Sequence, residues 1–247
     1  MDQGPFPRWL SEVMQGWEVP LWGAADLSGV GGAADASGEA LPRALAFAVP
    51  VHPLVMAGVR EGPTAGYAME YRRLNGLIDA VARDLAQKLW ERGCRAHAPD
   101  ASKRTDEANL RGEYPHKTAA TRAGLGWIGR HCQLITRSFG SWVRLGTVLT
   151  DAELPCGPPL ERSYCGTCDA CVRACPAGAL TGKAWLPGMP REEILDARAC
   201  DEWKKQRYSH LMQGRVCGIC SAVCPFSRTR GGRAAKQENQ DPPWCRF

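Results

Sequence analysis

Eight of the twelve cysteines in this chain lie between Cys165 and Cys224. The first four follow the pattern C-x2-C-x2-C-x3-C-P, which is that of bacterial ferredoxins. They are Cys165, Cys168, Cys171 and Cys175, followed by Pro176. Three closely spaced thiolates on one tight loop can reach three irons of a cubane, whereas the fourth, placed after the chain turns into a helix, points toward a second cluster. The spacing therefore predicts electron transfer through two [4Fe–4S] clusters.

A second, shorter run begins at Cys217 and reads C-x2-C-x3-C-P. Aligned on its final Cys224-Pro225 pair, it lacks the first cysteine of the full pattern, because Gly214 stands at that position. One ligand of the second cluster must therefore come from elsewhere in the chain.

Cys200 is the natural supplier of this ligand, since it lies between the two runs, and Cys245 and Cys156 are weaker candidates. Because the last cysteine of each run crosses to the other cluster, we expect two interleaved sets. Cluster one takes Cys165, Cys168, Cys171 and Cys224, and cluster two takes Cys175, Cys200, Cys217 and Cys220. The interleaving brings the clusters close enough to exchange electrons.

Disulfides and zinc are the alternative uses of so many cysteines. The first residues have no basic segment followed by an apolar one, so they do not resemble an export signal. We therefore expect a cytoplasmic protein, whose thiols stay reduced. Structural zinc pairs two separated Cys-x2-Cys knuckles, which differs from the first run. Iron–sulfur clusters are the favoured interpretation.

The residues before the cysteine module must contain whatever uses the electrons. Their apolar patterns mix strands with helices, which predicts an α/β (α+β) domain over residues 1–155. The double-cluster module then covers residues 156–228, and a polar, flexible tail covers 229–247.

Several elements of the front domain can be predicted from periodicity. We expect a start rich in Gly, Ala and Pro over residues 1–42, with a loop-like stretch at 29–40, and then a buried strand at 44–49 and a helix over 74–89 ended by Gly93. A helix at 115–123 follows, and then a strand pair at 132–136 and 142–150 joined by a turn around Gly140.

The bulk composition is that of a soluble globular protein. Hydrophobic residues make up 44% and charged residues 23%. No window approaches the roughly 20 consecutive apolar residues of a membrane helix, so no membrane partner is expected. The net charge of +5 is too mild for a nucleic-acid-binding signature.

Three segments together resemble the epoxyqueuosine reductase family, over roughly residues 44–226. They are PHKTAATRAGLGWIGRHCQLITRSFGSWVRLGTVLTDAELP, CGTCDACVRACPAGAL and VCGICSAVCPF. The resemblance implies a cobalamin-dependent iron–sulfur reductase that acts on epoxyqueuosine in tRNA. It also implies an architecture shared with reductive dehalogenases, in which a nitroreductase-like cobalamin domain precedes a two-cluster module, and the cluster assignment that includes Cys200.

The resemblance further implies a cobalamin held without a histidine ligand from the protein. The expected cofactor-binding residues are Gly124, Gly126, Trp127, Gly129, Gly140, Ser141 and Trp142. Gly124 and Gly126 would permit the close backbone approach that a bulky ring requires. The alternative is that this glycine pair ends a helix and packs tightly, and that the two tryptophans are core residues.

The chain departs from the family at the proton donor. The family carries an aspartate about seventeen residues before the tryptophan of GLGW, which corresponds here to Leu110, between Asn109 and Arg111. Several family enzymes also continue into helical repeats that hold tRNA, whereas this sequence stops at Phe247. We therefore expect a short relative with a different, smaller substrate, for which tRNA is a doubtful partner.

Three residues are candidates for the missing proton donor. His116 precedes the glycine pair on the same expected helix, and its ordinary pKa suits proton transfer near neutrality. Glu70 and Tyr71 resemble an Asp-Tyr pair of the family. A helix surface explains each of them equally well.

The sequence as a whole predicts an oxidoreductase. An external donor of the ferredoxin or flavodoxin class would charge the clusters, which would reduce cobalamin for chemistry on a small-molecule or nucleoside substrate. The alternatives are a non-catalytic electron carrier or adaptor and a flavin-dependent reductase. The oligomeric state is left open.

Overall fold

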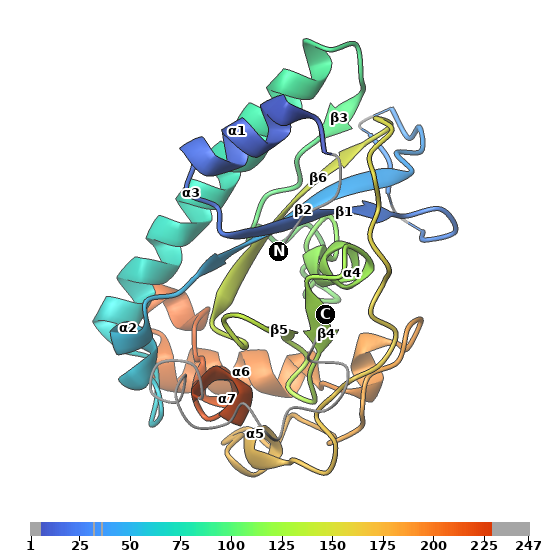
Figure 1. Ribbon diagram of the computed structural model, residues 1–247. Coiled ribbons are helices and arrows are strands. Elements are labelled where there is room, and N and C mark those ends of the chain that lie inside the picture. The colour runs from blue at the N-terminus through green and yellow to red at the C-terminus, as the bar shows by residue number, and fades with distance from the viewer. Residues whose placement is uncertain (1–5, 32, 36, 229–247) are drawn as a thin grey trace, which may run out of the picture.

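The computed structural model describes residues 6–31, 33–35 and 37–228 (Figure 1). The strands are β1 (Leu21–Asp26), β2 (Arg43–Pro50), β3 (Ala96–His97), β4 (Gly126–Ile128), β5 (Leu134–Thr136) and β6 (Val143–Thr150). The helices are α1 (Arg8–Gly16), α2 (Pro53–Ala57), α3 (Ala65–Trp90), α4 (His116–Arg122), α5 (Ala170–Arg173), α6 (Ala197–Tyr208), α7 (Ile219–Ala222) and α8 (Pro225–Arg228), with 3₁₀ turns η1 (Arg191–Glu193) and η2 (Met212–Gly214).

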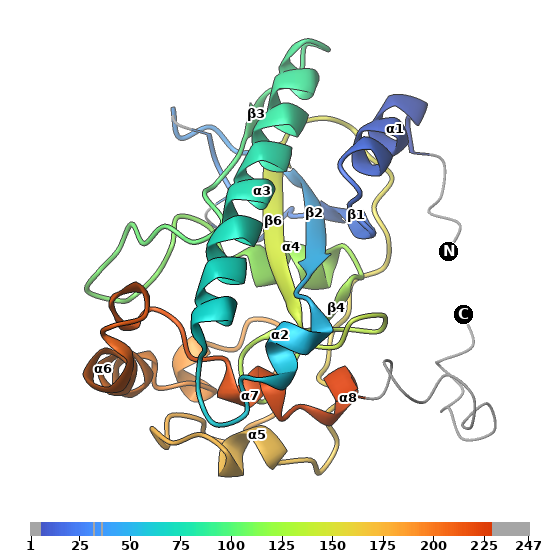
Figure 2. The same ribbon diagram turned by 90° about the vertical axis from the view of Figure 1, so that its left-hand side faces the viewer.

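A four-stranded sheet of order β1-β2-β6-β3 forms the centre of the front part, and its neighbouring strands are antiparallel. Helix α3 packs along one face of this sheet and α4 along the other (Figures 1 and 2). Because side chains alternate along a strand, successive side chains of β2 pack on opposite faces of the sheet. Phe47 and its alternate neighbours pack with α1 and α3, whereas Ala46 and its alternate neighbours pack with α4. Both faces of β2 are buried, as the apolar run 44–49 predicts.

A glycine opposite Phe47 makes room for that ring. Phe47 is fully buried and pairs across the sheet with Gly146 of β6. A Cβ at position 146 would lie 2.2 Å from Phe47 Cζ and 2.7 Å from Ile78 Cγ2 of α3. The glycine therefore allows the ring to lie flat between the sheet and α3.

Helix α3 connects the sheet to the cysteine module. Thr64 caps it by accepting a hydrogen bond from the Tyr67 backbone N–H at 3.1 Å, and Gly93 ends the following turn with a φ of +78°. The helix starts before the predicted residue 74, so that its first turns, with Tyr67 and Tyr71, reach the end of the molecule occupied by α6 and α7 (Figure 2).

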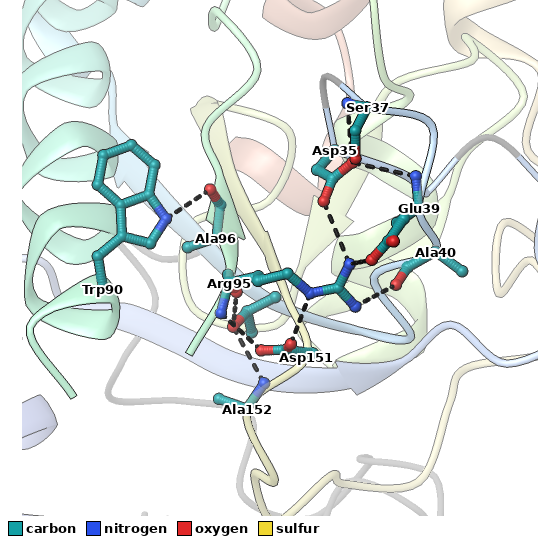
Figure 3. A network of polar contacts seen from close by, with 10 residues as sticks. Asp35, Ser37, Glu39, Ala40, Trp90, Arg95, Ala96, Asp151 and Ala152 are labelled. Carbon is teal, nitrogen blue, oxygen red and sulfur yellow. Dashed lines mark hydrogen bonds and ion pairs between the residues drawn. The ribbon is translucent and has the colours of Figure 1, made fainter. Parts of the chain in front are cut away.

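Arg95, just before β3, forms hydrogen bonds and ion pairs with the end of β6 and with the loop before β2 (Figure 3). Its backbone N–H and its Nε both donate to the Asp151 carboxylate, at 2.8 and 2.9 Å. Its Nη atoms reach Asp35, Glu39 and the Ala40 carbonyl oxygen. This network connects the loop before β2 to the sheet.

One sequence prediction was wrong. Residues 132–136 and 142–150 do not pair with each other: β5 pairs with β4, and β6 pairs with β2 and β3. β5 is short and β2 lies far from β6 in the sequence, so local alternation does not reveal these pairings. Helix α1 and strand β1, which lie within residues 1–42, were not predicted. The expected tail over 229–247 lies outside the described residues.

Residues 156–228 form short helices and turns, and they pack beneath the sheet and α3 in Figure 1. The division of the chain at residue 155 remains a prediction. Within the described ranges, none of the helices combines the length and the apolar character needed to cross a bilayer.

We expect Gly146→Ala to destabilise the fold by about 1–3 kcal/mol, because the added methyl group overpacks a filled core. Thermal unfolding measures this. Gly76→Ala on α3 is the matched control, since its Cβ would meet nothing within 4 Å, and it should stabilise the helix by roughly 0.5–1 kcal/mol. If Gly146→Ala were as stable as Gly76→Ala, the close packing on Phe47 would be refuted.

Candidate functional site

The structure brings the four cysteines predicted for cluster one together. Cys165 and Cys168 lie on a turn in which the Cys168 N–H donates to the Cys165 carbonyl oxygen at 3.1 Å. Cys171 lies on α5, and Cys224 directly precedes α8. Burial, followed by the neighbouring Cys165, Cys224 and Cys168, raises the pKa of the Cys171 thiol to about 11. These four thiols therefore share one site, in which Cys171 and Cys224 are buried.

A second group forms around Cys220 on α7. Burial raises the pKa of Cys220, and so do Cys217, Cys200, Cys171 and Cys175, in decreasing order. Helix α6 supplies Cys200, and Cys175 follows α5. The two groups are adjacent, because Cys171 of the first also acts on Cys220 of the second. Cysteines bind iron as thiolates, so cluster binding must displace the protons of these thiols.

The remaining described cysteines lie apart from these groups. Cys156 is exposed, donates to the Leu154 carbonyl oxygen at 3.4 Å, and has Arg43, Asp26 and Arg122 as its charged neighbours. Cys245 lies outside the described residues. Of the candidates for the eighth ligand that the structure describes, only Cys200 joins the second group.

The cysteine groups suit clusters rather than single ions. Among the described residues, no three His, Cys, Asp or Glu side chains converge closely enough to hold one metal ion. A cubane has a different requirement, because each of its four cysteines binds a different iron. Two groups of four spread thiols match that requirement.

A cavity of about 320 Å³, open to solvent on one side, lies between the front part and the second cysteine group. Its lining includes all four cysteines of that group, which are Cys175, Cys200, Cys217 and Cys220. Aromatic side chains contribute further walls, namely Tyr67, Tyr71, Trp142 and Trp203. Arg144, Lys204 and Arg215 also line it, and no Asp or Glu does. The cavity is therefore aromatic, cationic and next to a redox site.

Tyr71 is the one predicted proton-donor candidate that lines this cavity. Its hydroxyl lies 3.0 Å from Ser102 Oγ, and the Arg144 guanidinium stacks 4.0 Å above its ring. Asn75 Oδ1 accepts two hydrogen bonds from Arg144, at 3.1 and 2.8 Å, and so orients it. Burial raises the pKa of Tyr71, but Arg144, Ser102, Lys204 and Asn75 together lower it by more, so the net shift is downward.

The other two candidates lie away from the cavity lining. His116 uses both ring nitrogens, Nδ1 with Thr147 Oγ1 at 2.9 Å and Nε2 with the Asp100 carbonyl oxygen at 3.2 Å, and burial lowers its pKa. Glu70 accepts two hydrogen bonds from Arg73, at 2.8 and 3.0 Å. Both side chains are occupied by structural contacts.

Four of the predicted cofactor-binding residues are glycines, and protein atoms surround them. A Cβ at Gly126 would lie 2.2 Å from the Ile135 carbonyl oxygen, and one at Gly129 would lie 2.6 Å from Ile135 Cδ1. A Cβ at Gly140 would lie 2.5 Å from Ser227, and one at Gly124 would lie 3.0 Å from the Pro158 carbonyl oxygen. Close packing within the protein accounts for these glycines, and their cofactor role stays a prediction.

The three other predicted cofactor residues join the front part to the cysteine module. Trp127 stacks edge-on against Tyr164 and Phe226, beside the first cysteine group. Ser141 and Trp142 line the cavity. The Trp142 indole N–H donates to the Ser221 carbonyl oxygen of α7 at 2.9 Å.

The segment around Leu110, where the family carries its aspartate, is hydrogen-bonded to the cysteine module. The Arg191 guanidinium donates to the carbonyl oxygens of Leu110 at 3.0 Å and Asn109 at 2.7 Å, and Arg198 donates to that of Ala108 at 3.1 Å. This segment does not contribute to the cavity lining.

Sequence reasoning missed several lining residues, among them Tyr67, His131 and Arg144. Tyr67 stands four residues before Tyr71 on one helix face, a signal that could have been noticed. His131 and Arg144 reach the cavity only through the arrangement of separate strands, which leaves no local signal.

Comparison with known families and structures agrees with the site. Residues 164–227 match the family model of a 4Fe-4S double cluster binding domain. The epoxyqueuosine reductase of Synechococcus sp. strain RCC307 is 36% identical over 188 residues, covering 72% of this chain and 52% of the relative. That of Listeria monocytogenes is 33% identical over 138 residues, covering 55% and 35%. The chain thus spans about half or less of the length of these relatives.

Solved structures share the fold. A catabolic reductive dehalogenase, in complex with 3-bromo-4-hydroxybenzoic acid, superposes with a TM-score of 0.68 at 19% identity, covering 92% of this chain and 33% of its own. An epoxyqueuosine reductase with a modified tRNA-Tyr stem loop gives 0.53 at 20% identity, covering 91% and 66%.

These findings confirm the expected resemblance to epoxyqueuosine reductases, the mixed helix-and-sheet fold and the double [4Fe–4S] module. The assignment of individual cysteines to each cluster stays a prediction.

The eighth ligand can be tested by iron analysis. Anaerobically reconstituted protein should contain about eight irons, and Cys200→Ala should lower this to about four, because a cubane needs four ligands. Cys156→Ala and Cys245→Ala, the rival ligands, should each keep about eight. An unchanged iron content in Cys200→Ala would refute the assignment.

Proposed function

We propose that this chain is a redox enzyme whose two [4Fe–4S] clusters deliver electrons to a corrinoid in the cavity, for reduction of a small-molecule or nucleoside substrate. One observation carries the proposal: the cavity is lined by all four cysteines of the second group. A group bound there would lie next to a cluster, as single-electron transfer requires. An external donor of the ferredoxin or flavodoxin class would supply the electrons.

The residues of the cavity fit a corrinoid. Aromatic side chains provide flat walls, and the buried His131 has a nitrogen, Nε2, without a hydrogen-bond partner among the described residues. The second cluster would take the cysteine-lined end of this cavity, and the volume is at the low end for ligand pockets, so a large cofactor would extend out of the cavity into solvent. One solved structure of similar fold is described as suggesting a mechanism for B12-dependent dehalogenation. When bound, a corrinoid would supply a cobalt centre for two-electron reduction.

Tyr71 is the proton donor in this proposal. Reductive cleavage of a polar bond needs a proton for the leaving group, and a positioned acid contributes about 10²–10⁴ in rate. The Tyr71 phenol lines the cavity, Ser102 orients its hydroxyl, and Arg144 would stabilise the phenolate after the proton leaves. Asn75, rather than a carboxylate, holds Arg144, so the cation retains its charge toward the cavity.

The substrate is better matched by a small acceptor-rich molecule than by epoxyqueuosine in tRNA. The position of the family's aspartate is Leu110 here, and its segment stays outside the cavity lining. The lining carries three cations and no acid. Both features support a different substrate from that named for the relatives.

We expect the cluster-loaded protein to bind roughly one corrinoid per chain, detected by its absorption beyond that of the clusters. Reduced holoenzyme is then incubated with epoxyqueuosine-containing tRNA or with 3-bromo-4-hydroxybenzoic acid, beside a genuine epoxyqueuosine reductase. Turnover of the tRNA should be at least about 10²-fold slower than that of the reductase, because the aspartate is absent. Bound flavin, or no cofactor beside intact clusters, would favour the rival functions, and equal rates on tRNA would refute the substrate proposal.

We expect Tyr71→Phe to lower the turnover of whichever substrate reacts by about 10²-fold or more, with corrinoid binding unchanged. Because the pKa of Tyr71 is lowered below its ordinary value of 10.0, wild-type activity should fall as pH rises through a value below 10.0. This alkaline limb should be missing in Tyr71→Phe. His116→Gln is the matched control, since His116 does not line the cavity, and an equal loss of turnover in the control would contradict the assignment.

A further inference from the structure

Lys204 lies on α6 one helical turn after Cys200, so the two side chains project from the same face of the helix. Both line the cavity, as do Cys175 and Cys217 of the second cysteine group. The lysine side chain is only 14% exposed, although the long stem of a lysine normally carries its ammonium group into water. Lys204 therefore places a mostly buried positive charge in the wall that it shares with these cysteines.

Lys204 is the strongest charged influence on Cys200. Burial raises the pKa of this thiol, Lys204 lowers it, and the opposing effect of the acid Asp201 is smaller than that of Lys204. Burial also raises the pKa of Cys217, and Lys204 is one of the groups that lower it. The thiolates that these two cysteines would supply to a cluster thus have a cation as a close neighbour.

The nearest acid does not cancel this charge. Asp201 Oδ1 lies 3.6 Å from Lys204 Nζ, but the Asp201 carboxylate is closer to Lys205, at 2.9 Å, and to Arg104. One carboxylate is therefore shared among three cations. Within the described residues, the cavity lining contains no Asp or Glu, so Lys204 keeps a net positive charge toward the cysteines.

The influence of Lys204 is strongest on one side of the second cysteine group. Cys171 of the first group acts on Cys220, which places Cys220 toward the first group. Of the described residues that act most strongly on Cys171, Cys220 and Cys224, none is Lys204. Lys204 thus lies beside the predicted cluster two, at Cys200 and Cys217, rather than beside cluster one.

We propose that Lys204 raises the reduction potential of the second [4Fe–4S] cluster. A cubane held by four thiolates carries a net negative charge, and it becomes more negative by one unit when it takes one electron from the external donor by way of cluster one. A nearby cation stabilises the reduced form more than the oxidised form, because its attraction grows with the charge of the cluster. This inference needs the cluster but not the corrinoid, so it goes beyond the proposed function and does not depend on it.

The higher potential would affect the direction of electron transfer. An electron moves more favourably from cluster one to the cluster beside the cavity when the latter has the higher potential. Turnover alone does not measure this effect: burial raises the pKa of Tyr71, and Lys204 is one of the groups that lower it, so a Lys204 variant would also alter the proposed proton donor. The reduction potential is the direct measurement.

The test is a redox titration of anaerobic, cluster-loaded protein without corrinoid, followed by electron paramagnetic resonance of the reduced clusters. The signal that changes in Cys217→Ala identifies the second cluster. Lys204→Met removes the charge and should make this cluster about tenfold harder to reduce, which is about 59 mV for a one-electron couple. Lys204→Arg keeps the charge and should stay within about threefold of wild type. The potential of the first cluster should change in neither variant.

Lys205→Met is the matched control. Lys205 carries the same charge on the same helix and pairs with the same Asp201, but its side chain is 56% exposed and does not line the cavity. Because water and salt screen an exposed charge, both cluster potentials should match those of wild type in this variant.

The fold should tolerate the loss of Lys204, since Asp201 keeps Arg104 and Lys205 as partners. Iron content and thermal unfolding are measured for each variant. If Lys204→Met holds fewer than about eight irons, Lys204→Gln, which can still donate to Asp201, takes its place.

Three results would overturn the proposal. An unchanged potential of the second cluster in Lys204→Met, even with weaker binding of cob(II)alamin, would show that the lysine does not act on the cluster. An equal shift in Lys205→Met would reduce the effect to overall charge. An equal shift of both clusters would show that Lys204 does not act on the second cluster in particular.

Discussion

The burial of one cysteine group against the first turns of α3 is the contact on which the rest of the arrangement depends. Gly218, next to Cys217, has a φ of +88°, and a Cβ there would lie 2.8 Å from Val59 and 3.2 Å from the Tyr67 ring. Only a glycine allows the cysteine loop to approach the front part this closely. Because of this approach, the cavity has a redox site on one side and the tyrosines of α3 on the other.

Charge is distributed around the site in a consistent way. The cavity lining carries cations without carboxylates, whereas just behind it Asp201 of α6, only 4% exposed, pairs with Arg104, Lys204 and Lys205. These cations lower the pKa of Asp201 against the opposing effect of burial. A buried carboxylate is stable only when it is paired in this way. Asp201 thus holds part of the positive charge near the second cysteine group in place. The thiolates and sulfides of a cluster would add further negative charge next to these cations.

The sequence alone predicts those features whose signals are local. The cysteine runs define their chemistry by spacing, and the apolar periodicity of α3 and of the run 44–49 defines a helix and a buried strand. Features that depend on which segments meet in space escape such reasoning. Strand β6 pairs with β2 and β3, which lie far away in the sequence, and β5 pairs with β4 instead. The four glycines of the motif segments are explained by neighbours such as Ile135 and Ser227. Nothing in the sequence around His131 indicates that its ring is buried, or that its Nε2 lacks a hydrogen-bond partner among the described residues.

The attachment of the segment around Leu110 has a consequence for how such proteins diversify. Arg191 and Arg198 bind its carbonyl oxygens, not its side chains, so these contacts do not require particular side chains at positions 108–110. Leu110 adopts a left-handed conformation, with a φ of +54°, which limits that position to residues that tolerate it. Within that limit, side chains of this segment can change while its attachment to the cysteine module is kept.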